Sequence, residues 1–275
     1  MTTPFNIIQY LPLKVQRIFM PGLCIQSSKR TALLSSLLSL CFFIMIAHTT
    51  NSYATTLPHF KTSYHVNAFG VELGKAKHQF SCQQENCTLV SRAKPSGMAA
   101  LFFSDSSIET IQLKQSQERL IWLSYHKLGT SKKEGKQVQK HTTLQRNESK
   151  NQVVFIEKNR IWPLPSNIFD ILSLPYAIQY FKLNNKALNE LELYIQDSNF
   201  QEKLRFRVID QPDHLSFKFS NHEFKALKYV FESQQFKMEL WLLPKYQYFP
   251  AKIRLINKKE NKTITLNLAE LPKLL

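Results

Sequence analysis

Alternation of apolar and charged residues is the feature that most constrains how this chain folds. The stretch 203–209 reads KLRFRVI, so Leu, Phe and Val alternate with Lys and Arg. The same period of two recurs in 215–219, 236–242, 249–255 and 263–268. Successive side chains of a strand point to opposite faces of its sheet. The pattern therefore predicts an antiparallel sheet with one apolar face and one wet face.

Upstream segments continue this pattern, and turn signals such as Gln211-Pro212-Asp213 separate many of the predicted strands. The upstream strands are predicted at 60–69, 72–81, 87–93, 106–114, 119–127, 138–146, 152–160 and 189–196. The Lys-rich stretch 130–137 is predicted to be an exposed loop. So many strands in series predict a mainly β (α+β) chain, with a single strongly curved antiparallel sheet or a half-open barrel.

Two segments depart from the alternation. The stretch 96–104 is predicted to form one or two helical turns. The stretch 167–182 reads NIFDILSLPYAIQYFK and is apolar almost all round, which predicts a buried helix filling the concave face of the sheet. Asn167 followed by Asp170 resembles a capping box, and Pro175 is expected to kink or end the helix.

Residues 1–54 have the order of an export signal. They carry four basic residues and no acidic one, with an apolar run at 31–47. This order is typical of a secretory signal peptide, and small residues favour a cleavage between Ala54 and Thr55. An uncleaved anchor in the inner membrane, formed by 31–47, is the alternative, because about 17 apolar residues suffice to span a bilayer.

Both alternatives place 55–275, predicted to be a single curved-sheet domain, outside the cytoplasm, and the periplasm is the expected location. The basic region before the apolar run is long if Met1 is the start. A start at Met20 would give a signal of ordinary length.

Two of the four cysteines, Cys82 and Cys87, belong to 55–275 and flank a short polar turn. In an oxidising compartment they are expected to form a disulfide, and closing so short a loop would contribute about 2 kcal/mol. Two free thiols are the alternative. The spacing is not that of a Cys-x-x-Cys redox centre, and no His or Cys partners have metal-site spacing.

The charge balance is strongly basic, with 36 Lys and Arg against 20 Asp and Glu. The stretch 217–231 interleaves Lys with aromatic residues, as in proteins that stack nucleic-acid bases. Export makes nucleic acid an unexpected partner, so we interpret this stretch as an amphipathic strand pair. The basic exterior instead predicts anionic lipid head groups or an envelope protein as partners.

No motif in the chain identifies a reaction, and no catalytic residue, metal ligand or cofactor is predicted. The histidines of 55–275 are scattered. His65 and His78 are interpreted as polar residues exposed on strands. Asp213-His214 is interpreted as a solvent-exposed pair at a turn.

Several short motifs resemble one family. They are Phe60-x-x-x-Tyr64-x-Val66 followed by Gly70 and Gly74, then Gly97-Met98, Asp170-Ile-Leu-Ser173-Leu, Trp241-Leu-Leu-Pro244 and Phe249-Pro250-Ala-Lys-Ile-Arg254. In this order they resemble a bacterial exported family known as domain of unknown function 3108, over about 60–270. The stretch 115–150 departs most from the family.

The resemblance implies a lipoprotein-carrier-like fold, with about eleven strands and one or two helices in the concave face. Carriers of that fold shield acyl chains, and the family has no assigned reaction. The first hypothesis is therefore a non-catalytic envelope protein that binds a hydrophobic or lipid-like ligand between sheet and helix. A structural or interaction protein of the envelope is the second, and an envelope hydrolase with an unrecognised site is the third.

Overall fold

The structure is a computed structural model that describes residues 55–96, 106–116, 118–133 and 136–275. These residues belong to one compact unit, Tyr53–Leu275. The predicted export signal, its apolar run 31–47 and Ala54 lie outside the described residues, as do the predicted helical turns after Ser96 and the Gly97-Met98 motif. In the described part of the chain, no helix is long and apolar enough to cross a membrane.

Most of the described chain forms a single 14-stranded sheet. Its strands are β1 (Phe60–Ala68), β2 (Val71–Gln83), β3 (Asn86–Pro95), β4 (Ser106–Gln115), β5 (Leu120–Lys133), β6 (Lys136–Asn147), β7 (Gln152–Phe155), β8 (Arg160–Pro163), β12 (Arg205–Leu215), β13 (Phe224–Glu232), β14 (Phe236–Leu243), β15 (Phe249–Asn257), β16 (Lys262–Leu268) and β17 (Lys273–Leu274).

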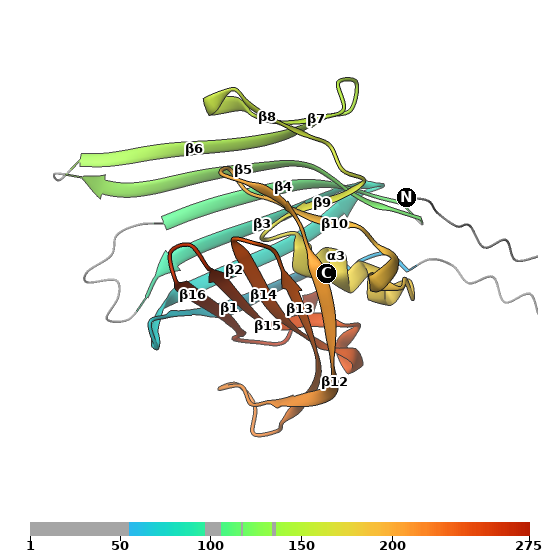
Figure 1. Cartoon of the computed structure of the whole chain (residues 1–275). Coiled ribbons are helices and arrows are strands. Elements are labelled where there is room, and N and C mark those ends of the chain that lie inside the picture. Colours follow the sequence, from blue (N-terminus) through green and yellow to red (C-terminus); the bar gives the residue numbers. More distant parts are fainter. Residues whose placement is uncertain (1–54, 97–105, 117, 134–135) are drawn as a thin grey trace, which may run out of the picture. The chain divides into compact units, whose positions relative to one another are not determined.

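The strand order is β12-β13-β14-β15-β16-β1-β2-β3-β4-β5-β6-β7-β8, with β17 also paired to β1. Neighbouring strands are antiparallel, and β16 pairs with β1. The sheet is curved (Figure 1). It is also open, because β12 and β8 are its two edges.

The remaining elements lie between β8 and β12 or in short connections. A second sheet contains β9 (Asn167–Asp170), β10 (Leu193–Gln196) and β11 (Gln201–Lys203), with β9 and β10 parallel. The α-helix of the described residues is α3 (Leu174–Leu183), and three short 3-10 helices are η1 (Ile156–Lys158), η2 (Leu188–Glu190) and η3 (Pro244–Tyr246).

Helix α3 is buried against the concave face of the large sheet. All residues from Leu174 to Phe181 are buried. The Tyr176 ring lies 5.1 Å from that of Phe60 on β1 and 6.2 Å from that of Phe249 on β15. Figure 1 shows the helix beside the strands of both halves of the sheet. The predicted buried helix is thus confirmed.

Its predicted bounds and start were wrong. Residues 167–170 form strand β9 and not the first helical turn. Asp170 caps the following turn instead, because its Oδ1 accepts hydrogen bonds from the backbone N–H groups of Leu172 (2.8 Å) and Ser173 (3.0 Å). Pro175 lies in the first turn of α3, where backbone N–H groups have no partner within the helix. The N–H that proline lacks is therefore not needed, and Pro175 fits the start of the helix without kinking it.

The number of about eleven strands that the family resemblance implied was also too low, since the large sheet alone has 14 strands. Several predicted segments have other bounds as well. The stretch 152–160 is divided by η1 into β7 and β8, and 189–196 becomes a strand only from Leu193. The stretch 215–219 is not a strand, since β12 ends at Leu215. In place of an exposed loop at 130–137, β5 and β6 continue to Lys133 and from Lys136.

The alternation itself is confirmed on β2, one of the strands that line the groove described below. On β2, Ala76, His78 and Phe80 are buried, whereas Lys75 and Lys77 are exposed. One face of the sheet therefore packs on the core and the other meets solvent.

Candidate functional site

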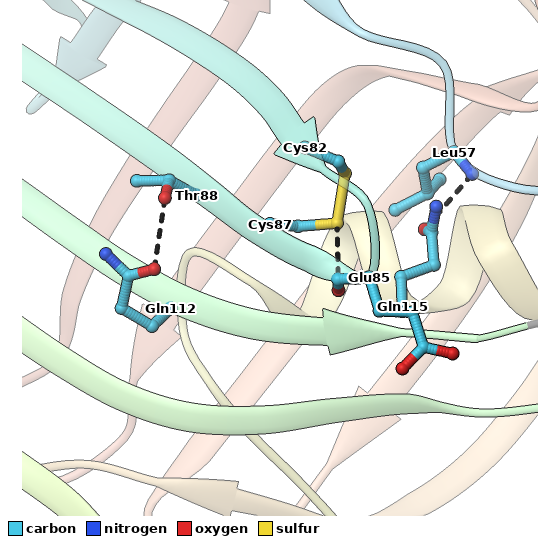
Figure 2. Close-up of a disulfide and its surroundings, with 7 residues drawn as sticks. All are labelled: Leu57, Cys82, Glu85, Cys87, Thr88, Gln112 and Gln115. Carbon is cyan, nitrogen blue, oxygen red and sulfur yellow. Dashed lines mark hydrogen bonds between the residues drawn. A yellow bond between two sulfur atoms is a disulfide. The ribbon is translucent and has the colours of Figure 1, made fainter.

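One end of the concave face is closed. Cys82 and Cys87 stand directly opposite each other on β2 and β3, and their sulfur atoms are bonded in the structure. Beside this disulfide, the Gln115 side chain accepts a hydrogen bond from the Leu57 N–H at 3.1 Å (Figure 2). On the same side, the Tyr180 hydroxyl of α3 donates to the carbonyl oxygen of Ser116 at 3.1 Å.

The other end of the concave face, beyond α3, contains a groove. It consists of two adjoining cavities of about 450 Å³ each, which we call the inner and the outer compartment. Their shared lining residues are Val66, Ala93, Lys127, Gly129 and Lys140. Pockets that hold small molecules have volumes of about 300–1,000 Å³, so each compartment is large enough for a ligand.

The inner compartment has an apolar floor. Inward-facing side chains of the large sheet supply it, namely Val66, Ala76, Ala93, Leu144, Leu255, Ile264 and Leu266. Ile171 and Leu172, from the turn between β9 and α3, form part of the opposite wall. The cavity thus lies between the sheet and the segment that leads into the helix.

A hydrogen-bonded trio lies on the β4–β5 side of the inner compartment. The Tyr125 hydroxyl donates to Glu109 Oε2 at 2.7 Å, and Lys127 Nζ lies 3.3 Å from Glu109 Oε1. Burial, reinforced by the nearby Glu109 charge, raises the pKa of Tyr125, so its hydroxyl keeps its proton. Both carboxylate oxygens of Glu109 therefore have a partner.

A second polar group, centred on His78, lies between the sheet and the helix. His78 Nδ1 is 2.7 Å from the Tyr176 hydroxyl of α3, which is 3.4 Å from the Tyr64 hydroxyl. Tyr64 donates in turn to the carbonyl oxygen of Pro250 at 2.7 Å. Burial lowers the pKa of His78 to about 4, so the ring is neutral at pH 7. Its Nε2 has no hydrogen-bond partner among the described residues.

The prediction that His78 is exposed was therefore wrong, since only 2% of its surface is accessible. The signal that would have placed it was in the sequence. His78 has the same parity as Ala76 and Phe80, and both of these face the core. His65 lies on β1 next to the core-facing Tyr64, so it points to the other face of the sheet and is partly exposed. Its Nδ1 lies 2.8 Å from Glu72 Oε1.

Asp170 was not identified from the sequence as part of the site, and it fixes one wall of the groove. Its Oδ2 accepts hydrogen bonds from the Trp122 indole N–H at 2.9 Å and from the Ser173 hydroxyl at 2.6 Å. Burial raises the pKa of Asp170, whereas these hydrogen bonds oppose that shift. The carboxyl group thereby joins the turn before α3 to strand β5.

Asp213 and His214 lie in strand β12 and not at a turn. The Asp213 carboxylate accepts a hydrogen bond from the Trp241 indole N–H. The exposed His214 lies 3.6 Å from Glu223. The pair therefore forms no acid–base site, and within the described residues no three His, Cys, Asp or Glu side chains are grouped to hold a metal ion.

Comparisons with known proteins assign no family. No family model matches the chain, and no curated protein matches it. Among solved structures, it is similar to the crystal structure of a β-barrel-like protein of domain of unknown function 1849 from Brucella abortus. The identity is 7% and the TM-score 0.48, over 80% of this chain and 99% of that one. So distant a likeness assigns no function to this chain.

Proposed function

We propose that this protein is a non-catalytic binding protein whose groove holds an amphiphile with an apolar chain and an anionic head group. The observation that carries the proposal is the groove itself, which adjoins the buried end of the concave face that α3 fills. A hydrophobic or lipid-like ligand between sheet and helix was also the first hypothesis from the sequence.

The apolar chain of the ligand is assigned to the inner compartment. Valine, leucine, isoleucine and alanine side chains from six strands line its floor. Covering that floor with an apolar chain would remove its surface from water, at about 25 cal/mol per Å².

The head group is assigned to the boundary between the compartments. Lys127 and Lys140 line both of them. Lys127 is paired with Glu109, whereas Lys140 is exposed and forms no ion pair within the described residues. Lys140 therefore has a free charge for a carboxylate or phosphate oxygen.

The finer predictions from the sequence fit this proposal and extend it. They are export to the periplasm or a tether formed by 31–47, membership of family 3108 and a lipoprotein-carrier-like fold. A carrier or sensor of envelope lipids would combine all of them.

A cavity-filling variant tests the proposal. Ala93 faces the groove on β3, whereas Val90 lies on the opposite face of the same strand. In the full-length protein, Ala93→Trp is expected to weaken binding of the fluorescent fatty acid cis-parinaric acid by at least about tenfold, or about 1.4 kcal/mol. Val90→Trp is the matched control and should bind as the unsubstituted protein does. Equal binding by both variants would refute a ligand in the groove.

The head-group assignment has a separate test. Lys140→Gln should weaken binding of cis-parinaric acid and leave binding of its uncharged methyl ester unchanged. A protein that acts only as an interaction module or as a hydrolase at another site would show no difference between the two probes.

A further inference from the structure

The turn between β1 and β2 carries an exposed aromatic residue in an unfavourable backbone conformation. Phe69 and Gly70 form a two-residue turn, with φ of 52° and 80°. Such turns favour Asn-Gly or Asp-Gly, because a bulky side chain is disfavoured at positive φ. Phe69 is 78% exposed and Val71, the next residue but one, is 56% exposed. Packing within the described chain therefore does not explain a phenylalanine here.

Positive charges lie on the outer face of the same hairpin and of the next strand. Lys75 stands opposite Lys94, and Lys77 stands opposite Arg92. All four are exposed, and none forms an ion pair within the described residues. Like charges directly opposite each other destabilise a sheet, so this arrangement lowers stability unless an anion lies against it.

On the other side of the turn, the outer face has a shallow hollow of about 570 Å³. Phe69 lines it together with Lys252 and Arg254 of β15. Arg254 lies 3.5 Å from Glu239, so part of its charge is balanced, and Lys252 lies against the Trp241 ring at 4.7 Å. Cations thus flank the exposed apolar turn on both sides.

We propose that this tip surface, formed by Phe69, Val71 and the flanking Lys75, Lys77, Arg92 and Lys94, docks on an anionic lipid bilayer. The apolar side chains enter the interface between head groups and acyl chains, and the cations meet the head groups. An anionic bilayer offers both an apolar layer and negative charge. Glu72, the acidic residue beside Val71, is already in contact with His65 and Lys218.

The tip surface lies at the open end of the groove, because Leu73 and Gly74, which follow Val71 on β2, line the outer compartment. Docking there would bring the mouth of the groove to the bilayer. The inference goes beyond the proposed ligand, since docking does not require an occupied groove.

Depth-dependent quenching tests the docking. The full-length variant Phe69→Trp is mixed with vesicles of equal parts phosphatidylcholine and phosphatidylglycerol, with bromine atoms on the acyl chains near the head groups. We expect strong quenching beyond that of the unsubstituted protein. Ile161→Trp, at a residue of β8 that is 54% exposed, is the matched control and should not be quenched. Segment 1–54 is the same in both variants, so its own affinity for lipid does not affect the comparison.

The role of charge is tested in the Phe69→Trp background by Lys77→Gln with Arg92→Gln, two residues that do not line the groove. The lipid concentration at half-maximal quenching should rise several-fold, by less than the factor of about 30 that two fully engaged charges would give, because Lys77 lies further along β2 than Val71. Lys150→Gln with Lys158→Gln, near the β8 edge, should leave it unchanged. Absence of quenching at position 69, equal quenching at 161, or equal quenching by phosphatidylcholine alone would each overturn the proposal. An acidic protein as the true partner would give the first of these results.

Discussion

Replacing His78 by Phe should change how the stability of the protein depends on pH. The pKa of His78 is about 4 in the folded protein and 6.5 without burial. Because the folded pKa is the lower one, the unfolded chain binds the proton more tightly. The contribution of His78 to stability is complete above pH 6.5 and is lost as the pH falls toward 4.

The magnitude follows from the two pKa values. Between pH 8 and pH 5 the loss from His78 alone amounts to about 2 kcal/mol. Phe keeps the aromatic packing but cannot form the hydrogen bond with the Tyr176 hydroxyl. The Tyr176 hydroxyl then keeps only its 3.4 Å contact with the Tyr64 hydroxyl. At pH 8 this loss costs about 1 kcal/mol. His78→Phe should therefore be less stable than the unsubstituted protein at pH 8 and more stable below about pH 6.

Urea unfolding at several values between pH 5 and pH 8 measures the difference in free energy of unfolding between the two proteins. Other titrating groups cancel in that difference. His222→Phe, at an exposed residue, is the control for the substitution itself. A difference for His78→Phe that does not change with pH would refute the conclusion that the ring is held neutral by burial.

Three further predictions concern stability. Phe69→Asn, which suits the positive φ, should raise the free energy of unfolding by about 1 kcal/mol in thermal denaturation while it reduces vesicle binding; a loss of stability would contradict the turn assignment. Trp122→Phe leaves Asp170 without its indole donor, so urea unfolding should show a loss of stability of about 1–3 kcal/mol. An unchanged stability would show that this hydrogen bond is not made in solution. Replacing both Cys82 and Cys87 by Ala should lower stability by about 2 kcal/mol relative to the oxidised protein, and should make no difference under reducing conditions if the chain-entropy account holds.

The sheet was predictable from the sequence wherever one face is apolar and the other charged. On β2 the alternation of Lys75 and Lys77 with Ala76 and Phe80 predicts the strand and its buried face. The end of β5 and the start of β6 were missed, because a strand with two polar faces carries no hydrophobic period. Strand β9 was missed since it depends on parallel pairing with β10, more than twenty residues later.

The groove could not be predicted in the same way. Its position depends on how far α3 reaches along the concave face relative to the ends of the strands, and no local pattern specifies that distance. The parity of His78 was visible in the sequence, but its contact with Tyr176 joins residues 98 positions apart. Residues such as Asp170 acquire their role only when the turn before α3 meets β5.

The pairing of β16 with β1 has a consequence for how the chain reaches its fold. Strands β1 to β8 and strands β12 to β16 are two series of neighbouring hairpins, and residues Tyr64–Ala68 pair with Ile264–Leu268 to join them. Each series can form from local contacts, whereas the seam between them needs both ends of the described chain and closes slowly. Until β16 has been synthesised, that part of β1 is an unpaired edge that other chains can extend, so a chaperone that shields β1 should increase the yield of folded protein.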